Sequence, residues 1–299
     1  MSYLLHLAIF LSIYAILSLS MNLVVGYHGL LPLSHSSFFA IGAYATALST
    51  VVLGIGFLPA VLIAVCTCVL FSLVVSLPAW NYGGDFFVLI SLAVQVVLFS
   101  VFRNWGSVKA PLGSLFNMTN GTFGISGVPR PTFFGTEVAP LWAMALIAIA
   151  VVTLVALLVW ALGASPWGRL LKCARDDELV IRGLGKRTHL MKLQSFAVSC
   201  ALAGLAGAVY VSYVGYIDPS IGSLDHSILI LSMVLVGGAG NFVGPLIGAS
   251  ILVLLPEFLR AFRLPDTTAA NIRLILFGLL LILLMRFRPQ GVAGEYRVD

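Results

Sequence analysis

Residues 138–162 read VAPLWAMALIAIAVVTLVALLVWAL, a run of 25 residues without a charged side chain. About 20 apolar residues in a helix cross the hydrocarbon core of a bilayer. A membrane β-barrel would instead show segments of about ten residues with alternating polarity. Comparable apolar stretches recur at residues 4–25, 30–53, 57–78, 86–102, 193–216, 226–260 and 272–285. The sequence therefore predicts an all-α, polytopic transmembrane helical bundle of about eight to ten spans.

The overall composition supports a membrane protein that forms a single transmembrane domain over residues 1–299. Of these residues, 60% are hydrophobic and only 9% are charged, and the mean hydropathy is +1.08. A soluble domain carries roughly 25% charged residues, so this chain has too little polar surface to coat a globule in water. The N-terminal apolar stretch lacks a preceding basic segment and reaches spanning length, which predicts a first span rather than a cleavable signal peptide.

The basic residues are distributed very unevenly along the chain. Residues 1–102 contain no Lys or Arg, whereas seven of the sixteen basic residues lie within residues 169–192. Short basic loops stay in the cytoplasm, so the loop of about residues 164–192 is expected inside, with 103–138 and 217–225 outside. This clustering in one interhelical loop also argues against nucleic acid as a partner, despite the net charge of +5.

Two regions, residues 26–36 and 237–245, are interrupted by Gly and Pro. Non-helical backbone at membrane depth is tolerated only where it is buried in protein or lines a cavity. Each region therefore predicts either a tight turn between two spans or a broken, re-entrant helix. If residues 226–260 form two spans, the basic C-terminal segment lies inside, as the charge rule favours. Arg260 and Arg263 then lie outside, which the rule disfavours.

The sequence holds no set of residues typical of a membrane enzyme. It has no His-Glu-x-x-His motif and no pair of acids within a span. Residues 183–187, GLGKR, lack both the spacing and the Ser/Thr of a phosphate-binding loop, so ATP hydrolysis would need a partner. The four cysteines show no metal-ligand spacing, and Asp85, beside two glycines, is more typical of a helix cap than of an ion site. We therefore expect no catalytic residue, no metal site and no cofactor.

Two polar positions fall at membrane depth. His35 lies in the serine-rich start of the second apolar stretch, which predicts either a residue of a pathway or a satisfied packing histidine. Gln95 lies in an otherwise apolar span, where an amide is costly unless it faces protein or a water-filled cavity. Gln95 therefore predicts either a pathway position or a hydrogen bond between helices.

The basic loop has helical potential over residues 169–182 and carries charges of both signs. Gly183 and Gly185 can end such a helix. A short cytoplasmic helix of this kind suits docking to another protein. The same charges also fit an ordinary positive-inside loop or attraction to anionic lipid headgroups, so the charge pattern leaves both interpretations open.

Five segments carry a resemblance to a known family. They are residues 22–44 (NLVVGYHGLLPLSHSSFFAIGAY), 120–129 (NGTFGISGVP), 165–185 (SPWGRLLKCARDDELVIRGLG), 233–249 (MVLVGGAGNFVGPLIGA) and 287–291 (FRPQG). In this order they closely resemble the LivM-type permease subunit of ABC importers for branched-chain amino acids. The resemblance covers about residues 20–292.

The resemblance implies tasks for named residues. The loop at residues 165–185 contacts the ATPase in such permeases, so the expected coupling residues are Gly168, Arg169, Arg175, Asp176, Asp177, Glu178, Arg182 and Gly185. The expected substrate-pathway residues are Asn22, Ser34, His35, Phe38, Tyr44, Gln95, Asn120 and Gly121. The implied partners are a LivH-like second permease, two ABC ATPase subunits and a periplasmic substrate-binding protein, all at a bacterial inner membrane.

The chain departs from the family pattern near the expected pathway. Pro32 and Ser34 replace the usual Ser and Gly beside His35, and Gln95 stands where many members have an acid. These departures leave the substrate open between branched-chain amino acids and the urea or short amides that similar permeases carry. A self-sufficient channel or ion-coupled carrier is the alternative of a different class.

Overall fold

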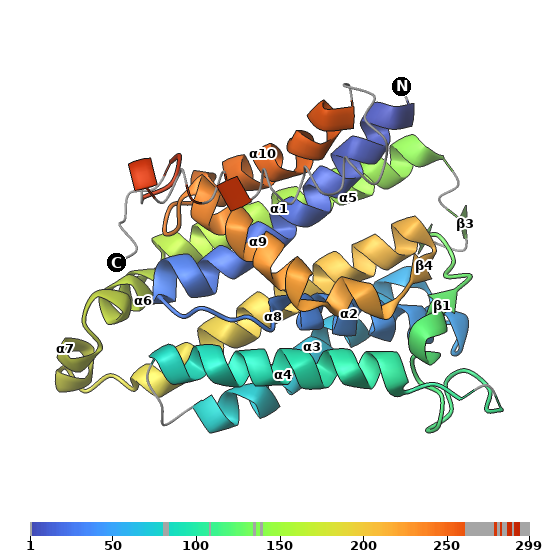
Figure 1. The fold of residues 1–299 in the computed structure, drawn as a ribbon, viewed down its shortest axis with the longest axis horizontal. Coiled ribbons are helices and arrows are strands. Elements are labelled where there is room, and N and C mark those ends of the chain that lie inside the picture. Colours follow the sequence, from blue (N-terminus) through green and yellow to red (C-terminus); the bar gives the residue numbers. More distant parts are fainter. Residues whose placement is uncertain are drawn as a thin grey trace.

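The computed structural model describes residues 2–79, 84–107, 109–133, 136–137, 140–260, 278–279, 282, 286–288 and 290–293. Its named helices are α1 (Ser2–His28), α2 (His35–Val51), α3 (Phe57–Ala79), α4 (Gly84–Asn104), α5 (Leu141–Ala164), α6 (Pro166–Asp176), α7 (Glu178–Gly183), α8 (Thr188–Val214), α9 (Leu224–Gly237) and α10 (Val243–Arg260). The short elements are η1 (Gly121–Phe123), β1 (Ile125–Ser126), β2 (Thr132–Phe133), β3 (Thr136–Glu137), β4 (Tyr216–Ile217) and η2 (Pro219–Gly222). The predicted all-α membrane bundle is confirmed (Figure 1).

The helices correspond closely to the apolar stretches of the sequence. Five described helices, α1, α3, α4, α5 and α8, are long and apolar enough to cross a bilayer. The stretch 226–260 divides into two helices, α9 and α10, around the glycine-rich residues 238–242, which confirms the predicted interruption. The last expected span, residues 272–285, lies almost entirely outside the described residues, so the total of eight to ten spans stays a prediction.

The centre of the bundle consists of α1, α2 and α8, which are largely buried, whereas only 22–28% of the span residues of α3, α4 and α5 are buried. The backbones of α2 and α8 approach each other very closely. A Cβ atom on Gly42 would lie 2.3 Å from the carbonyl oxygen of Gly204, and one on Gly207 would lie 2.2 Å from that of Phe39. Small residues permit this contact, and helix association in lipid depends on such close packing.

Helix α2 begins inside the bundle rather than at its edge. After α1 ends, residues 29–34 form no helix, and α2 begins only at His35. The Nε2 atom of His35 lies 2.9 Å from Oγ of Ser20, which is about 12 Å along α1 from its last residue. The stretch expected from residue 30 is therefore helical only from His35, because the chain turns back at Gly29, where φ is +75°.

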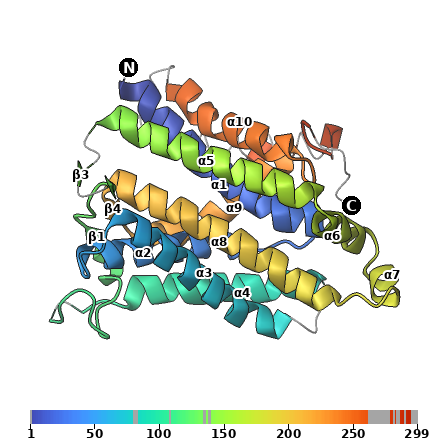
Figure 2. The same ribbon diagram turned by 180° about the vertical axis from the view of Figure 1, so that it is seen from behind.

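The connections between helices gather at two opposite ends of the bundle (Figures 1 and 2). At the strand end, β1 pairs antiparallel with β4, with Ile125 opposite Ile217, so the predicted outer loops 103–138 and 217–225 meet. Helices α6 and α7 lie at the opposite end, the loop end. The basic loop and the two outer loops therefore lie on opposite sides, as expected. That the loop end faces the cytoplasm stays a prediction from the charges.

Candidate transport pathway and coupling loop

A buried layer of polar side chains lies where α2, α4 and α9 meet. This serine–glutamine layer consists of Ser36, Ser37, Gln95 and Ser227, none of which is more than 1% exposed. Gln95 Oε1 accepts a hydrogen bond from Ser37 Oγ at 2.6 Å, and its Nε2 donates to Ser36 Oγ at 3.0 Å. Ser227 Oγ donates to Ser36 Oγ at 2.8 Å and accepts the Ser36 N–H at 3.0 Å. The layer thus connects three helices.

The layer satisfies its polar groups through neighbouring backbone as well. Gln95 Nε2 also donates to the carbonyl of Gly222 at 2.5 Å, and Ser36 Oγ donates to the carbonyl of Ser223 at 2.7 Å. A buried polar group left unpaired costs about 1–3 kcal/mol. Of the two roles expected for Gln95, hydrogen bonding between helices is confirmed by these contacts, and its pathway role stays a prediction.

Ser34 and His35 carry polar atoms that the layer leaves unpaired. Both side chains are 0% exposed, and neither Ser34 Oγ nor His35 Nδ1 has a hydrogen-bond partner in the described part of the chain. They lie at the start of α2, where helix N–H groups lack partners within the helix and the dipole is positive. Transporters hold polar parts of substrates at such half-helix starts. The pathway role of these two residues stays a prediction, and this geometry gives it a physical basis.

The aromatic pathway candidates fill space between helices. Phe38 packs edge-on against Phe196, with ring centroids 5.4 Å apart, and Tyr44 stacks on Phe102 at 5.1 Å. Both candidate side chains are buried. Their observed contacts are those of packing residues.

The candidates Asn120 and Gly121 shape the strand end, away from the layer. Asn120 has a left-handed backbone, with φ of 60°, and its Nδ2 donates to the carbonyl of Gly124 at 2.8 Å. A Cβ atom on Gly106 would lie 2.4 Å from the backbone nitrogen of Gly121. Asn22 lies at the other end of the bundle, bonded to the turn between α9 and α10. The structure therefore does not bring these three candidates together with Gln95.

The basic loop forms two helices where the sequence predicted one over residues 169–182. Helix α6 begins after Ser165, whose Oγ accepts the N–H of Gly168 at 3.2 Å. Asp177 has an extended backbone, and its Oδ1 accepts two N–H groups of α7 at 2.8 and 3.1 Å. A carboxylate at this position stabilises a helix start. The expectation of a single helix was wrong because Asp177 ends α6 and caps α7.

Glu178 holds α7 against α8. Its Oε1 lies 2.8 Å from Nη2 of Arg182 and 2.9 Å from Nζ of Lys192. Partial burial alone would raise the pKa of Glu178, but hydrogen bonds from Lys192, Thr188 and Arg182, with the charge of Lys192, lower it to about 2. The carboxylate is therefore ionised at neutral pH and is paired within this chain.

The expected coupling residues differ in exposure. Arg175 is turned inward: its side chain is 11% exposed, and its Nη1 donates to the backbone carbonyl of Gly26. Glu178 is half-buried and Gly168 is buried. The exposed members, which a partner can reach, are Arg169, Asp176, Asp177, Arg182 and Gly185.

Sequence reasoning missed an apolar surface on the same loop. Leu179, Val180 and Leu184, called the apolar tip, are 76%, 57% and 70% exposed. Large apolar side chains gathered on an exposed loop indicate a contact surface. The signal was present in the sequence as apolar residues inside a charged loop, but the charges dominated the interpretation.

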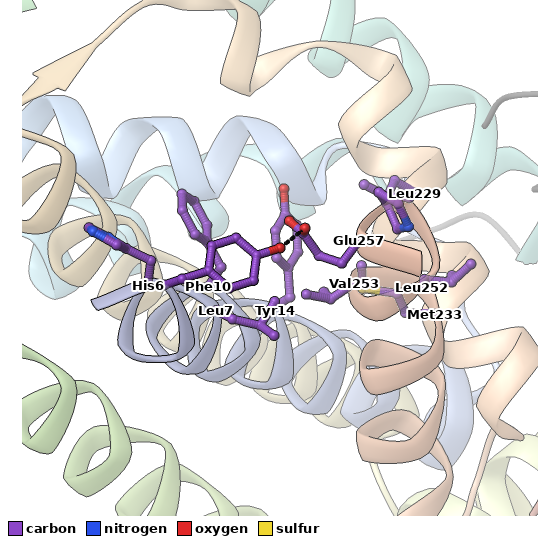
Figure 3. A pocket seen from close by; sticks show the side chains of 11 residues that line it. His6, Leu7, Phe10, Tyr14, Leu229, Met233, Leu252, Val253 and Glu257 are labelled. Carbon is purple, nitrogen blue, oxygen red and sulfur yellow. Dashed lines mark hydrogen bonds between the residues drawn. The ribbon is translucent and has the colours of Figure 1, made fainter. Parts of the chain in front are cut away.

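Two cavities near the strand end were also not predicted. The larger, of about 420 Å³, lies between α1, α9 and α10 (Figure 3). His6, Phe10 and Tyr14 line it with apolar residues of α9 and α10, and Tyr3 donates a hydrogen bond to Glu257 at its edge. The second, of about 320 Å³, shares His6 and Phe10. Among the described residues, no group of three His, Cys, Asp or Glu side chains could hold a metal ion.

The sequence matches a protein-family model described as branched-chain amino acid transport system / permease component over residues 3–285. It is 29% identical to the high-affinity branched-chain amino acid transport system permease protein LivM of Escherichia coli (strain K12), over 94% of this chain and 67% of that protein. It is 27% identical to the probable LivM of Methanocaldococcus jannaschii, over 60% of this chain and 54% of that protein. It is 26% identical to the autoinducer 2 import system permease protein LsrC of Yersinia pestis (strain Pestoides F), over 66% and 55%. No solved structure matches the chain.

Proposed function

Because this chain belongs to the family of branched-chain amino acid transport permease components, we propose that it forms half of a membrane pathway for branched-chain amino acids. The other half is a second, LivH-like permease. The observation that carries this proposal is the similarity to the LivM of Escherichia coli, which extends over 94% of the chain. The proposed location is the inner membrane of a bacterium.

The energy for transport comes, in this proposal, from two separate ABC ATPase subunits. The sequence has no phosphate-binding loop of its own. The basic loop, which forms α6 and α7 and is called the α6–α7 loop from here on, supplies a surface for docking an ATPase. Its apolar tip is exposed, and exposed charges of both signs lie beside the tip. Burial of Leu179 and Leu184 in a partner would remove apolar surface from water, and the charges around them would orient the contact.

The pathway itself, in this proposal, passes the start of α2. An amino acid in transit carries an ammonium group, a carboxylate group and, here, an aliphatic side chain. The unpaired atoms of Ser34 and His35 can exchange hydrogen bonds with the charged groups, and the buried apolar side chains of Phe38 and Phe39 follow in the same helix. A periplasmic binding protein would deliver the substrate at the strand end, where the loops 103–138 and 217–225 meet.

The test is transport by the assembled complex. This chain, a second permease, two ATPases and a binding protein of the same transport system are reconstituted in proteoliposomes. We expect ATP-dependent accumulation of leucine, and none when the ATPases carry a substitution of their phosphate-binding lysine. Accumulation of urea or acetamide instead of leucine would contradict the proposed substrate. Leucine flux through this chain alone, without ATPases, would contradict the proposed class of transporter.

A further inference from the structure

The side chain of Arg175 points away from the charged surface of the loop and into the bundle. Its side chain is 11% exposed, whereas that of the neighbouring Asp176 is 61% exposed. Its Nη1 donates a hydrogen bond to the backbone carbonyl of Gly26, in the last turn of α1. Carbonyls in the last turn of a helix lack partners within that helix and lie at the negative end of its dipole. The guanidinium of Arg175 supplies both a hydrogen-bond donor for this carbonyl and a positive charge at the negative end of the dipole.

Two glycines form the slot that the Arg175 side chain occupies. A Cβ atom on Gly29 would lie 2.5 Å from Cγ of Arg175, and one on Gly240 would lie 3.0 Å from its Nη1. Both glycines have positive φ, 75° and 87°, a conformation that residues with side chains rarely adopt. Gly29 follows α1 and Gly240 lies in the turn between α9 and α10. One side chain of α6 therefore contacts both segments.

The two segments that enclose Arg175 are themselves bonded to each other. Asn22 of α1 accepts the N–H of Gly240 at 3.0 Å and donates to the carbonyl of Asn241 at 2.9 Å. A Cβ atom on Gly26 would lie 2.4 Å from the backbone nitrogen of Gly240. The end of α1 and the α9–α10 turn thus form one closely packed unit, and Asn22 is part of it.

From this unit, α1 continues to the start of α2. Ser20 contacts His35 at 2.9 Å, and its carbonyl accepts a hydrogen bond from Ser199 of α8 at 2.6 Å. Ser18 donates to the carbonyl of Pro245 in α10 at 3.0 Å. Packed interiors transmit displacement because they have few voids and low compressibility. A shift at the end of α1 therefore reaches the start of α2, which carries the serine–glutamine layer.

We propose that Arg175 is a positioning residue, which transmits movement of the α6–α7 loop to α1 and to the α9–α10 turn, rather than a contact of the ATPase. The proposal rests on the proposed function, since it is the ATPase that would move the loop. The loop, shifted as a rigid body, displaces the Arg175 side chain, whose stem lies against Gly29 and whose guanidinium lies against Gly26 and Gly240. In this proposal the exposed apolar tip and the exposed charges contact the ATPase, and Arg175 transmits the movement of the loop to the helices of the pathway.

The test compares Arg175→Gln and Arg175→Lys with Arg286→Gln, a control that removes an exposed positive charge outside the basic loop. Each variant is assembled with its partner subunits in proteoliposomes. The measured quantities are the ATPase that copurifies, the ATP hydrolysis with leucine-loaded binding protein, and the leucine taken up per ATP hydrolysed. Thermal unfolding of each purified permease in detergent checks that the variants fold.

We expect Arg175→Gln to retain its ATPase but to take up roughly tenfold less leucine per ATP, because it loses a hydrogen bond from a charged group. Arg175→Lys should give an intermediate value, since Lys keeps the charge but lacks the planar fork of donors. Arg286→Gln should match the wild type. If Arg175→Gln does not fold, Arg175→Lys decides the question by the same measurements.

If the wild-type complex accumulates leucine, two results would overturn this inference. Loss of the ATPase from a folded Arg175 variant would make Arg175 a direct contact, and unchanged uptake per ATP would remove its role in transmission. Failure of the proposed function gives a different result. A wild-type complex that accumulates no leucine would overturn the function and, with it, the premise of the inference.

Discussion

The serine–glutamine layer and the α6–α7 loop are both polar, but they satisfy their polar groups in opposite ways. In the layer, neutral amide, hydroxyl and carbonyl groups bond one another with almost no exposed surface. In the loop, charged groups pair at the surface, as Glu178 does with Arg182, and the apolar tip faces outward. An unpaired polar group is costly in lipid, whereas an exposed ion pair contributes little in water. We therefore expect the layer to govern stability and, in the proposed function, the loop to govern binding.

The largest effect on stability is expected from Gln95→Leu. The variant loses the hydrogen bonds to Ser36, Ser37 and Gly222. Interhelical hydrogen bonds in membranes contribute roughly 0.6–2 kcal/mol each, and some of the former partners stay unpaired. We expect the free energy of unfolding to fall by about 2–3 kcal/mol, measured by denaturant titration in detergent, with loss of transport.

The matched control for Gln95→Leu is Ser232→Ala in α9. Ser232 is buried, and its Oγ donates only to the carbonyl of Ile228 in its own helix, at 2.7 Å, among the described contacts. We expect a change below about 0.5 kcal/mol, as for substitutions away from bonding networks. Equal effects of the two substitutions would show that the layer does not hold the helices together.

The largest effect on binding is expected from the paired substitution Leu179→Ser and Leu184→Ser. Both side chains are more than two-thirds exposed, so the stability of the permease should not change. If the apolar tip enters a pocket of the ATPase, the affinity for it should fall roughly 10- to 100-fold. Binding of ATPase to permease in nanodiscs measures this. If the permease lost stability but kept its affinity for the ATPase, the loop would contribute to stability rather than to binding, contrary to our expectation.

Within the layer, Ser36 and Ser37 provide a finer test. Among the described contacts, Ser36 Oγ takes part in hydrogen bonds with Gln95, Ser227 and Ser223, whereas Ser37 Oγ makes one, with Gln95. We expect Ser36→Ala to lower the free energy of unfolding by about 1–2 kcal/mol and Ser37→Ala by about 0.5 kcal/mol. Denaturant titration of both variants checks the order. The reverse order would mean that proximity to Gln95, rather than the number of bonds, sets the effect.

Most spanning helices could be predicted from the sequence because most apolar stretches have about the length of a span. The break at residues 26–36 was predicted from its Gly and Pro, but the first residue of α2 was not, because apolar residues continue from residue 30 while the helix begins only at His35. What fixes that start is a contact between segments, the bond of His35 to Ser20, which no local pattern contains. The break between α9 and α10 was visible, since glycines and Pro245 interrupt the apolar run.

The candidate site was predictable in its parts but not in its contacts. The charge pattern identified the loop, yet charge alone does not tell an exposed arginine such as Arg182 from the inward-turned Arg175. Burial of Arg175 depends on glycines far away in sequence, including Gly240. The capping role of Asp177 could have been read, because an acid before apolar residues is a helix-start signal.

The smallest effect concerns the pH dependence of the loop. Contacts with Lys192, Thr188 and Arg182 hold the pKa of Glu178 at about 2, below the value near 4.3 of an unfolded chain. A lowered pKa means that the stabilisation is complete above about pH 4.3 and is lost as the pH falls toward 2. Glu178 is partly exposed, so the effect should be under about 1 kcal/mol and weaker at high salt.

The mobility of a spin label on Lys186→Cys, in a chain without Cys66 and Cys173, reports this loosening of the loop. We expect constant mobility from pH 7.5 to about 5 and a rise below about 4.3, since protonation releases both Arg182 and Lys192 from Glu178. Glu178→Gln should be more mobile at neutral pH and should lack the rise. A rise of the same size in Glu178→Gln would contradict this prediction. The ion pairs of the loop would then not be what positions its apolar tip.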